Sequence, residues 1–179
     1  MTQPTGMTPE FSRPLAAESI GAQGLQRRIE ASPAEREKLA RRFDLLALDR
    51  LEATLMLQRE KGEVIRLEGR FIADVVQSCV VTLAPVPAHL EVDFETRYSA
   101  SVAAAAEEEL DPLGEDGPEA IVGGEIDLGE AVAQQLAVAL DPYPRAPGAS
   151  LAAGEDPNAL EEGAAPNPFA ALAALKKKS

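Results

Sequence analysis

Three consecutive segments in the middle of the chain alternate apolar and polar residues, and this pattern constrains the fold more than any other feature. A period of two places every second side chain on the same side of a β-strand, so each segment is expected to be a strand with one buried face. Short connections between the segments favour an antiparallel sheet covered on one side. The residues on the apolar side are Leu51, Ala53, Leu55 and Leu57, then Ile65, Leu67, Phe71, Ala73 and Val75, then Leu90, Val92, Phe94, Thr96 and Tyr98.

Prolines mark the expected limits of this pairing. The second strand is predicted to continue through "CVVTL", residues 79–83, with Cys79 packed as a strand residue. Pro85 and Pro87 are expected to end the pairing, because proline has no N–H to donate to a ladder. The segment 10–20 is predicted as a short edge strand, since Pro14 cannot donate to neighbours on both sides.

Two segments of the expected folded domain carry helix signals. Residues 33–43 follow a capping box, in which Ser32 is the N-cap, Pro33 takes the first helical position and Glu35 lies three residues after the cap. Residues 128–140 follow Asp127, which can cap a helix, and the helix ends before two prolines. The second helix has an apolar stripe that is expected to cover the bare face of the sheet, formed by Leu128, Val132, Leu136 and Leu140.

These elements predict an α+β fold, with a curled antiparallel β-sheet covered by one amphipathic helix and the 33–43 helix packed at an edge. Residues 1–10 are predicted as a flexible tail, 11–147 as the folded domain and 148–166 as a linker. An acidic loop is expected at 103–120. A short tethered helix is predicted over 167–176, capped by Asn167, started by Pro168, and apolar on the face that carries Phe169, Leu172 and Leu175. This last face is a candidate for docking on a partner, and folding back onto the domain is the alternative.

Charge is distributed unevenly along the chain. The net charge is −13, yet residues 107–162 hold 15 acids and one base, Arg145, a net of −14. So acidic a chain repels nucleic acid at long range and can attract a basic partner. A cationic cluster is the exception, and its candidate contacts with RNA or another partner are Arg27, Arg28, Arg36, Lys38, Arg41 and Arg42. The alternative is an ordinary amphipathic helix whose charges pair locally with Glu30, Glu35 and Glu37.

Little in the chain indicates chemistry. Cys79 is the only cysteine and His89 the only histidine, so a structural zinc site and an internal disulfide are not expected. A catalytic pair of Cys79 and His89 is an alternative to a packed cysteine, but no motif supplies a third group to orient it. We therefore expect no enzyme, no cofactor, no metal and no small-molecule substrate. The sequence has no secretory signal and no apolar run of about 18 residues, which predicts a cytoplasmic protein without a membrane anchor.

Several motifs together resemble the YceD family. They are "QSCVVTL", then "DLGE" opening a helix that ends in "LDPYPR", then "NPF" near the end of the chain. The resemblance is strongest to the alphaproteobacterial branch. Many family members carry further cysteines that look able to bind a metal, and this chain has Gln77, Ser78 and the segment 144–154 in their place. The positions that carry the signature are Cys79, Asp127, Leu128, Gly129, Glu130, Pro144, Asn167, Pro168 and Phe169.

The resemblance implies a role in ribosome biogenesis without implying catalysis. YceD proteins are implicated in the accumulation of large-subunit ribosomal RNA. The expected partners are a ribosomal protein, an rRNA-processing factor or the rRNA itself. The alternative function is a protein-binding adaptor that acts through the acidic loop and the C-terminal helix, without direct contact with RNA.

Overall fold

The structure, a computed structural model, describes residues 9–60, 64–100 and 117–150. The chain divides into two units, Met1–Ala146 and Pro147–Ser179, and everything below concerns the first. This unit is an α+β fold whose main sheet has five strands in the order β2-β3-β4-β5-β6. These strands are β2 (Leu25–Glu30), β3 (Ala47–Arg59), β4 (Val64–Ser78), β5 (Pro85–Ser99) and β6 (Glu119–Ala120). The sheet is open and antiparallel, except that β6 runs parallel to β5.

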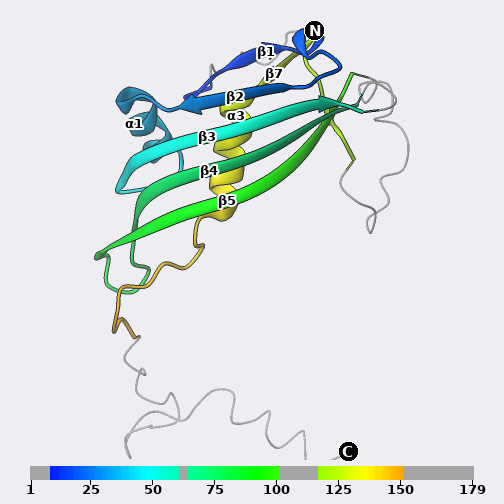
Figure 1. The fold of residues 1–179 in the computed structure, drawn as a ribbon. Helices are drawn as coiled ribbons and strands as arrows, with labels where there is room; N and C mark the ends of the chain where they lie inside the picture. Colours follow the sequence, from blue (N-terminus) through cyan, green and yellow to red (C-terminus); the bar gives the residue numbers. More distant parts are fainter. Residues whose placement is uncertain (1–8, 61–63, 101–116, 151–179) are drawn as a thin grey trace, which may run out of the picture. The chain divides into compact units, whose positions relative to one another are not determined.

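A second, two-stranded antiparallel sheet joins distant parts of the chain. It pairs β1 (Pro14–Ala16) with β7 (Glu125–Asp127), and a short 3-10 helix, η1 (Ala17–Ser19), follows β1. The segment predicted as an edge strand therefore contains one. The described residues include two α-helices, α1 (Pro33–Arg42) and α3 (Leu128–Ala139). In Figure 1, α3 crosses one face of the sheet behind the strands, and α1 lies beside the end of β2.

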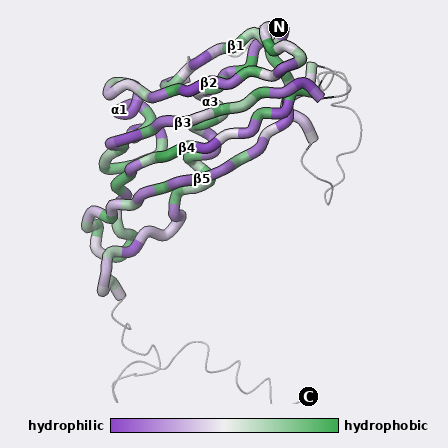
Figure 2. The backbone as a smooth tube through the Cα atoms, viewed as in Figure 1, coloured by the Kyte–Doolittle hydropathy of each residue, from purple (hydrophilic) through white to green (hydrophobic). Residues whose placement is uncertain are grey.

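The alternating pattern predicted for the three long strands is confirmed. Buried and exposed residues alternate along β3 and β4, and along β5 the inward residues are half-buried until Tyr98, which is buried. Figure 2 shows the same alternation as bands of hydrophobic and hydrophilic backbone. Inward side chains of β5 are more accessible because β6 pairs with only its last two residues, leaving most of β5 as an edge.

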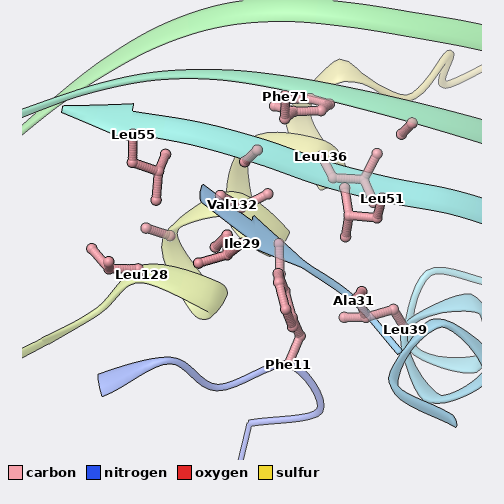
Figure 3. Close-up of a cluster of buried hydrophobic side chains, with 14 of the residues drawn as sticks. Phe11, Ile29, Ala31, Leu39, Leu51, Leu55, Phe71, Leu128, Val132 and Leu136 are labelled. Carbon is pink, nitrogen blue, oxygen red and sulfur yellow. The ribbon is translucent and has the colours of Figure 1, made fainter. Parts of the chain in front are cut away.

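One core holds side chains from the sheet, both helices and the N-terminal segment. Figure 3 shows Val132 and Leu136 of α3 beside Leu51 and Phe71 of the sheet, with Phe11 nearby. Phe11 is fully buried although it precedes β1. The predicted cap of α1 is also confirmed, because Ser32 and Glu35 form a complete capping box. Dense packing of this kind leaves little room for change in side-chain volume.

Several predictions about strand limits are wrong. β4 ends at Ser78, so Cys79 to Ala84 form a turn and "CVVTL" does not continue the strand. Pro85 and Pro87 lie within β5 and pair with Ser78 and Val76 instead of ending the pairing. The carbonyl of Ala84 accepts from Cys79 N–H at 2.8 Å, so alternate residues from Ala84 onward face β4. The two prolines therefore face the open edge, where a missing N–H costs no ladder bond.

Other limits shift as well. β3 starts at Ala47, before the predicted strand, and an irregularity between Leu48 and Arg50 lets both Leu48 and Leu51 face the core. Glu10 falls in the predicted tail but forms an ion pair with Arg42 at 3.0 Å, which makes the tail shorter than predicted. Glu119 and Ala120, assigned to the acidic loop, form β6. Residues 103–116 of that loop, most of the 148–166 linker and the whole 167–176 helix lie outside the described residues.

Candidate functional site

The cationic residues predicted to contact RNA or a partner lie on β2 and α1, and most have protein partners. Arg42 forms a two-pronged ion pair with Glu130, at 2.9 and 2.8 Å, and a further bond to Glu10 at 3.0 Å. Bonding to Glu130 is the main cause that raises the pKa of Arg42. Arg42 therefore joins α1 to the first turn of α3 and to the N-terminal segment. Its charge is already matched by two carboxylates.

The other five cationic residues have fewer charged partners than Arg42. Arg28 pairs with Glu52 of β3 at 3.0 Å, and Arg36 donates to the carbonyl of Ala31 at 2.8 Å. Arg41 lies 3.9 Å from Glu37, one helical turn away. Within the described ranges, Arg27 and Lys38 have no ion-pair partner. Contact of the six residues with RNA or another partner stays a prediction.

The outer face of the sheet carries charges that pair across strands. On β4, Arg70 contacts Glu91 of β5 and lies 3.6 Å from Asp93. Arg66 contacts Glu68 at 2.8 Å on the same strand. Cross-strand pairs of opposite charge stabilise sheets modestly and leave little free charge of either sign. This face is polar and locally balanced.

Cys79 lies at the start of the β4–β5 turn and its side chain is fully buried. Its Sγ accepts backbone N–H bonds from Ala146 at 3.3 Å and from Val81 and Thr82, each at 3.4 Å. The bond from Ala146, then a hydrogen bond with the Thr82 side chain and the two other backbone bonds, lower the pKa of the Cys79 thiol to about 6. The cysteine is packed, as predicted, but in a turn instead of a strand. Three backbone N–H groups converge on its sulfur atom.

His89 is not brought to Cys79. Its Nδ1 lies 2.5 Å from Asp74 Oδ1 on the exposed face of the sheet, where the two residues are directly opposed across β4 and β5. Cys79 is buried five residues further along the chain than Asp74. The pair considered from the sequence therefore does not form in this structure.

Two of the signature motifs meet at the Cys79 turn. Gln77 Nε2 donates to the carbonyl of Asp141 at 2.8 Å, and Val80 N–H donates to the carbonyl of Pro144 at 2.9 Å. With the bond from Ala146 to Cys79, these contacts tie the segment after α3 to the end of β4. "QSCVVTL" and "LDPYPR" thus form one connection.

The "DLGE" motif fastens the other end of α3. Asp127 caps the helix by accepting from the N–H groups of Gly129 and Glu130, at 3.0 and 3.1 Å. The same carboxylate accepts from Ser12 Oγ at 2.5 Å and from Arg13 N–H at 2.8 Å. Leu128 is buried in the core, and Gly129 packs closely against the backbone of the N-terminal segment. These signature residues position α3, and none of them shows a free reactive group.

An exposed apolar surface surrounds the Cys79 turn, and we call it the apolar end. It consists of Leu46, Val80, Leu83 and Tyr143, which are 56, 50, 77 and 71 % exposed. Leu46 N–H donates to the carbonyl of Val76 near the end of β4, which places it beside the turn. Leu83 has φ of 60°, a left-handed conformation that is unfavourable for leucine. An exposed apolar side chain in a strained turn is typical of a contact surface.

No pattern in the sequence points directly to the apolar end, because its four residues come from three connections that look unrelated along the chain. The candidate docking residues Phe169, Leu172 and Leu175, together with Asn167 and Pro168, lie outside the described residues and stay predictions. No helix among the residues that the structure describes is long and apolar enough to cross a membrane.

Comparison with known proteins identifies the family. A family model described as "Large ribosomal RNA subunit accumulation protein YceD" matches residues 67–176, which is more than half of the chain. The match begins in β4 and includes the Cys79 turn, β5 and α3. No curated protein and no solved structure matches the chain. On the strength of the family match, the chain belongs to the YceD family.

Proposed function

We propose that this protein is a non-enzymatic cytoplasmic factor that supports the accumulation of large-subunit ribosomal RNA by binding a protein partner. The family description supports the link to large-subunit rRNA. The observation that carries the mode of action is that three of the five candidate RNA-binding arginines, Arg28, Arg41 and Arg42, pair with carboxylates of the same chain. The partner is a basic ribosomal protein or an rRNA-processing factor.

Charge pairing argues against direct contact with rRNA. A phosphate that binds Arg42 must displace two carboxylates that already accept its N–H bonds. Affinity for nucleic acid comes largely from cations that replace counterions on phosphates, and paired arginines supply little of it. The segment 107–162, with a net charge of −14, adds long-range repulsion of RNA. The same charge attracts a basic protein.

The apolar end supplies a surface on which such a partner can dock. Apolar contacts give most of the affinity at protein interfaces, and aromatic residues such as Tyr143 are enriched at their centres. Leu83 is the most exposed of the four residues and holds the least favourable backbone conformation. The turn that presents it is fixed by the backbone bonds around Cys79, so the surface is preorganised for binding.

The function is tested in cells that lack the gene. Loss of the gene is expected to lower the ratio of large-subunit to small-subunit rRNA, and the wild-type chain restores it. Leu83→Asn removes the apolar side chain but suits a left-handed conformation, so it is expected to preserve the melting temperature and to restore the ratio poorly. Ala22→Asn, in an exposed turn elsewhere, is the control and is expected to restore it fully. An unchanged rRNA ratio in the deletion strain would refute the proposal.

A second measurement separates protein binding from RNA binding. Purified protein is titrated with large-subunit rRNA at rising salt concentration. We expect only weak binding, with no change in an Arg27→Gln/Lys38→Gln variant, which removes two cations of the candidate cluster that have no ion pair within the described ranges. Tight binding that falls steeply with salt and is lost in this variant would assign direct phosphate contact instead.

A further inference from the structure

A cavity of about 500 Å³ lies where the end of β5 meets β6, β7 and the first turns of α3. It is at the opposite end of α3 from the helix's connection to the Cys79 turn, and Figure 1 shows β7 leading directly into this end of the helix. Among the described residues, four carboxylates line it and no lining residue is cationic. They belong to Glu119, Glu125, Asp127 and Glu130.

Two of the four carboxylates already bond to other groups of the chain. Asp127 accepts bonds from Ser12, Arg13 and the α3 amides, and Glu130 holds Arg42. Glu119 and Glu125 form no ion pair with any residue in the described part of the chain. Partial desolvation raises the pKa of Glu119 above its ordinary value although the side chain is exposed, and no cation among the described residues offsets this effect. The cavity thus offers two available negative groups.

A tyrosine hydroxyl is available at the same place. The side chain of Tyr98 is only 7 % exposed, lines the cavity, and has no hydrogen-bond partner among the residues that the structure describes. Burial and then the charges of Glu119 and Asp127 raise its pKa, so the phenol stays protonated at neutral pH. A tyrosine whose ring is buried usually bonds its hydroxyl, so an unbonded hydroxyl that borders a cavity is available to a ligand.

The lining also indicates what kind of cation fits. Among the described residues, no three carboxylate, cysteine or histidine groups are close enough together to hold a metal ion. Pro14, Val122, Ile126 and Ala131 add apolar surface beside the carboxylates. A charged head on an aliphatic stem satisfies both parts of this lining, because the stem contacts apolar side chains while the head reaches the acids.

We propose that the cavity binds the side chain of a lysine or arginine presented by a basic polypeptide, with the cationic head between Glu119, Glu125 and the hydroxyl of Tyr98. The inference rests on the proposed function for the identity of the partner as a protein, and it names the chemistry by which that partner is recognised. A cation held there gains two charged acceptors and satisfies the tyrosine hydroxyl.

Tyrosine emission provides a direct assay. The chain has two tyrosines and no tryptophan, so Tyr143→Phe leaves Tyr98 as the only tyrosine. The full chain with this change is titrated with hexa-arginine and hexa-lysine peptides, which have no fluorescence of their own. We expect a saturable change in Tyr98 emission, and none with a glycine–serine hexapeptide. The absence of a saturable response to both basic peptides would overturn the proposal.

Matched charge variants locate the binding. Glu119→Gln/Glu125→Gln is expected to weaken peptide binding at least tenfold without lowering the melting temperature, since both side chains are exposed. Glu37→Gln/Asp49→Asn removes the same charge from exposed positions on α1 and β3 and is expected to change the Kd less than twofold. Equal weakening by the two double variants would show attraction to the overall negative charge and would overturn the assignment to the cavity.

A titration with spermine distinguishes a basic peptide from a free polyamine as the source of the cation. Spermine carries the same ammonium and aliphatic chemistry without a peptide backbone. Hexa-arginine is expected to bind more tightly than spermine, and tighter spermine binding that displaces the peptide would assign the cavity to free polyamines instead. The rRNA ratio in the deletion strain tests the proposed function independently. Loss of that function with intact peptide binding, or the reverse, therefore shows which of the two inferences fails.

Discussion

Replacing Gly129 by alanine should destabilise the protein, although helix propensity predicts the opposite. Gly129 lies in the first turn of α3. In a helix interior, alanine is favoured over glycine by about 1 kcal/mol. A Cβ atom at this position would lie 2.3 Å from the carbonyl oxygen and 2.8 Å from the carbonyl carbon of Phe11. These are backbone atoms, so the segment around Phe11 must move as a whole.

That movement disturbs contacts whose size can be estimated. Ser12 and Arg13 donate to the charged Asp127 carboxylate, and bonds to charged groups contribute about 1.5–3 kcal/mol each. Phe11 is fully buried, and burying such a side chain contributes about 1.5–3 kcal/mol. Losing one such bond and part of the Phe11 contact, less the gain in propensity, gives a net loss of about 2–4 kcal/mol.

Urea unfolding followed by circular dichroism measures this loss. With an m-value of about 2 kcal/mol/M, the midpoint should fall by roughly 1–2 M. Gly21→Ala is the control, because nothing lies within 4 Å of its added Cβ, and it should change stability by less than about 1 kcal/mol. Ser12→Ala should also cost less in the Gly129→Ala background than in the wild type, since the bond is already disturbed. A Gly129→Ala protein at least as stable as the wild type would refute the reasoning.

Three further outcomes are expected. Gly69→Ala places a Cβ 2.3 Å from the Phe94 ring and should cost about 1–3 kcal/mol in urea unfolding, with partial recovery when Phe94→Leu is added. Arg13 and the Ser32 cap lower the pKa of Glu35 to about 2. The wild type should therefore be more stable than Glu35→Gln by about 1 kcal/mol, a value suited to a largely solvated pair. This difference should be full above pH 4.5 and disappear as the pH falls towards 2. A pH-independent difference would contradict this. Buried Cys79 should react with iodoacetamide far more slowly in the native protein than in urea, and equal rates would show that the turn is open.

The elements that the sequence predicted are those set by local rules. A strand with one buried face must alternate, and the caps at Ser32 and Asp127 act over three residues. Strand limits depended on neighbours instead. Pro85 and Pro87 are tolerated in β5 because they face an open edge, and nothing in the local sequence distinguishes an edge strand from a central one.

Contacts between residues far apart in the sequence were the features that the sequence predicted least well. Local spacing suggested that the arginines of α1 pair with nearby glutamates, which describes Arg41 and Glu37 but not Arg42. Arg42 instead bonds Glu130, which is 88 residues away, and Glu10. The cavity was also beyond prediction, since Tyr98 was expected only to face inward and Glu119 was assigned to a loop. Such sites arise from topology, which periodicity and spacing do not specify.

The signature residues gain a physical meaning from where they lie. Asp127 and Gly129 fix one end of α3 to the N-terminal segment, and the segment from Pro144 to Ala146 fixes its other end to the Cys79 turn. The acidic cavity borders the first end, and the apolar end lies at the second. With 12 residues at about 1.5 Å each, α3 holds the two surfaces roughly 20 Å apart.

A partner that uses both surfaces must therefore span that distance with a basic segment at one side and an apolar one at the other. Two contacts on one rigid partner bind cooperatively, because the first raises the effective concentration of the second. Removing either contact should then weaken binding of the whole partner by much more than it weakens binding of a short peptide that reaches only one surface. Equal losses for partner and peptide would mean that the two surfaces serve different ligands.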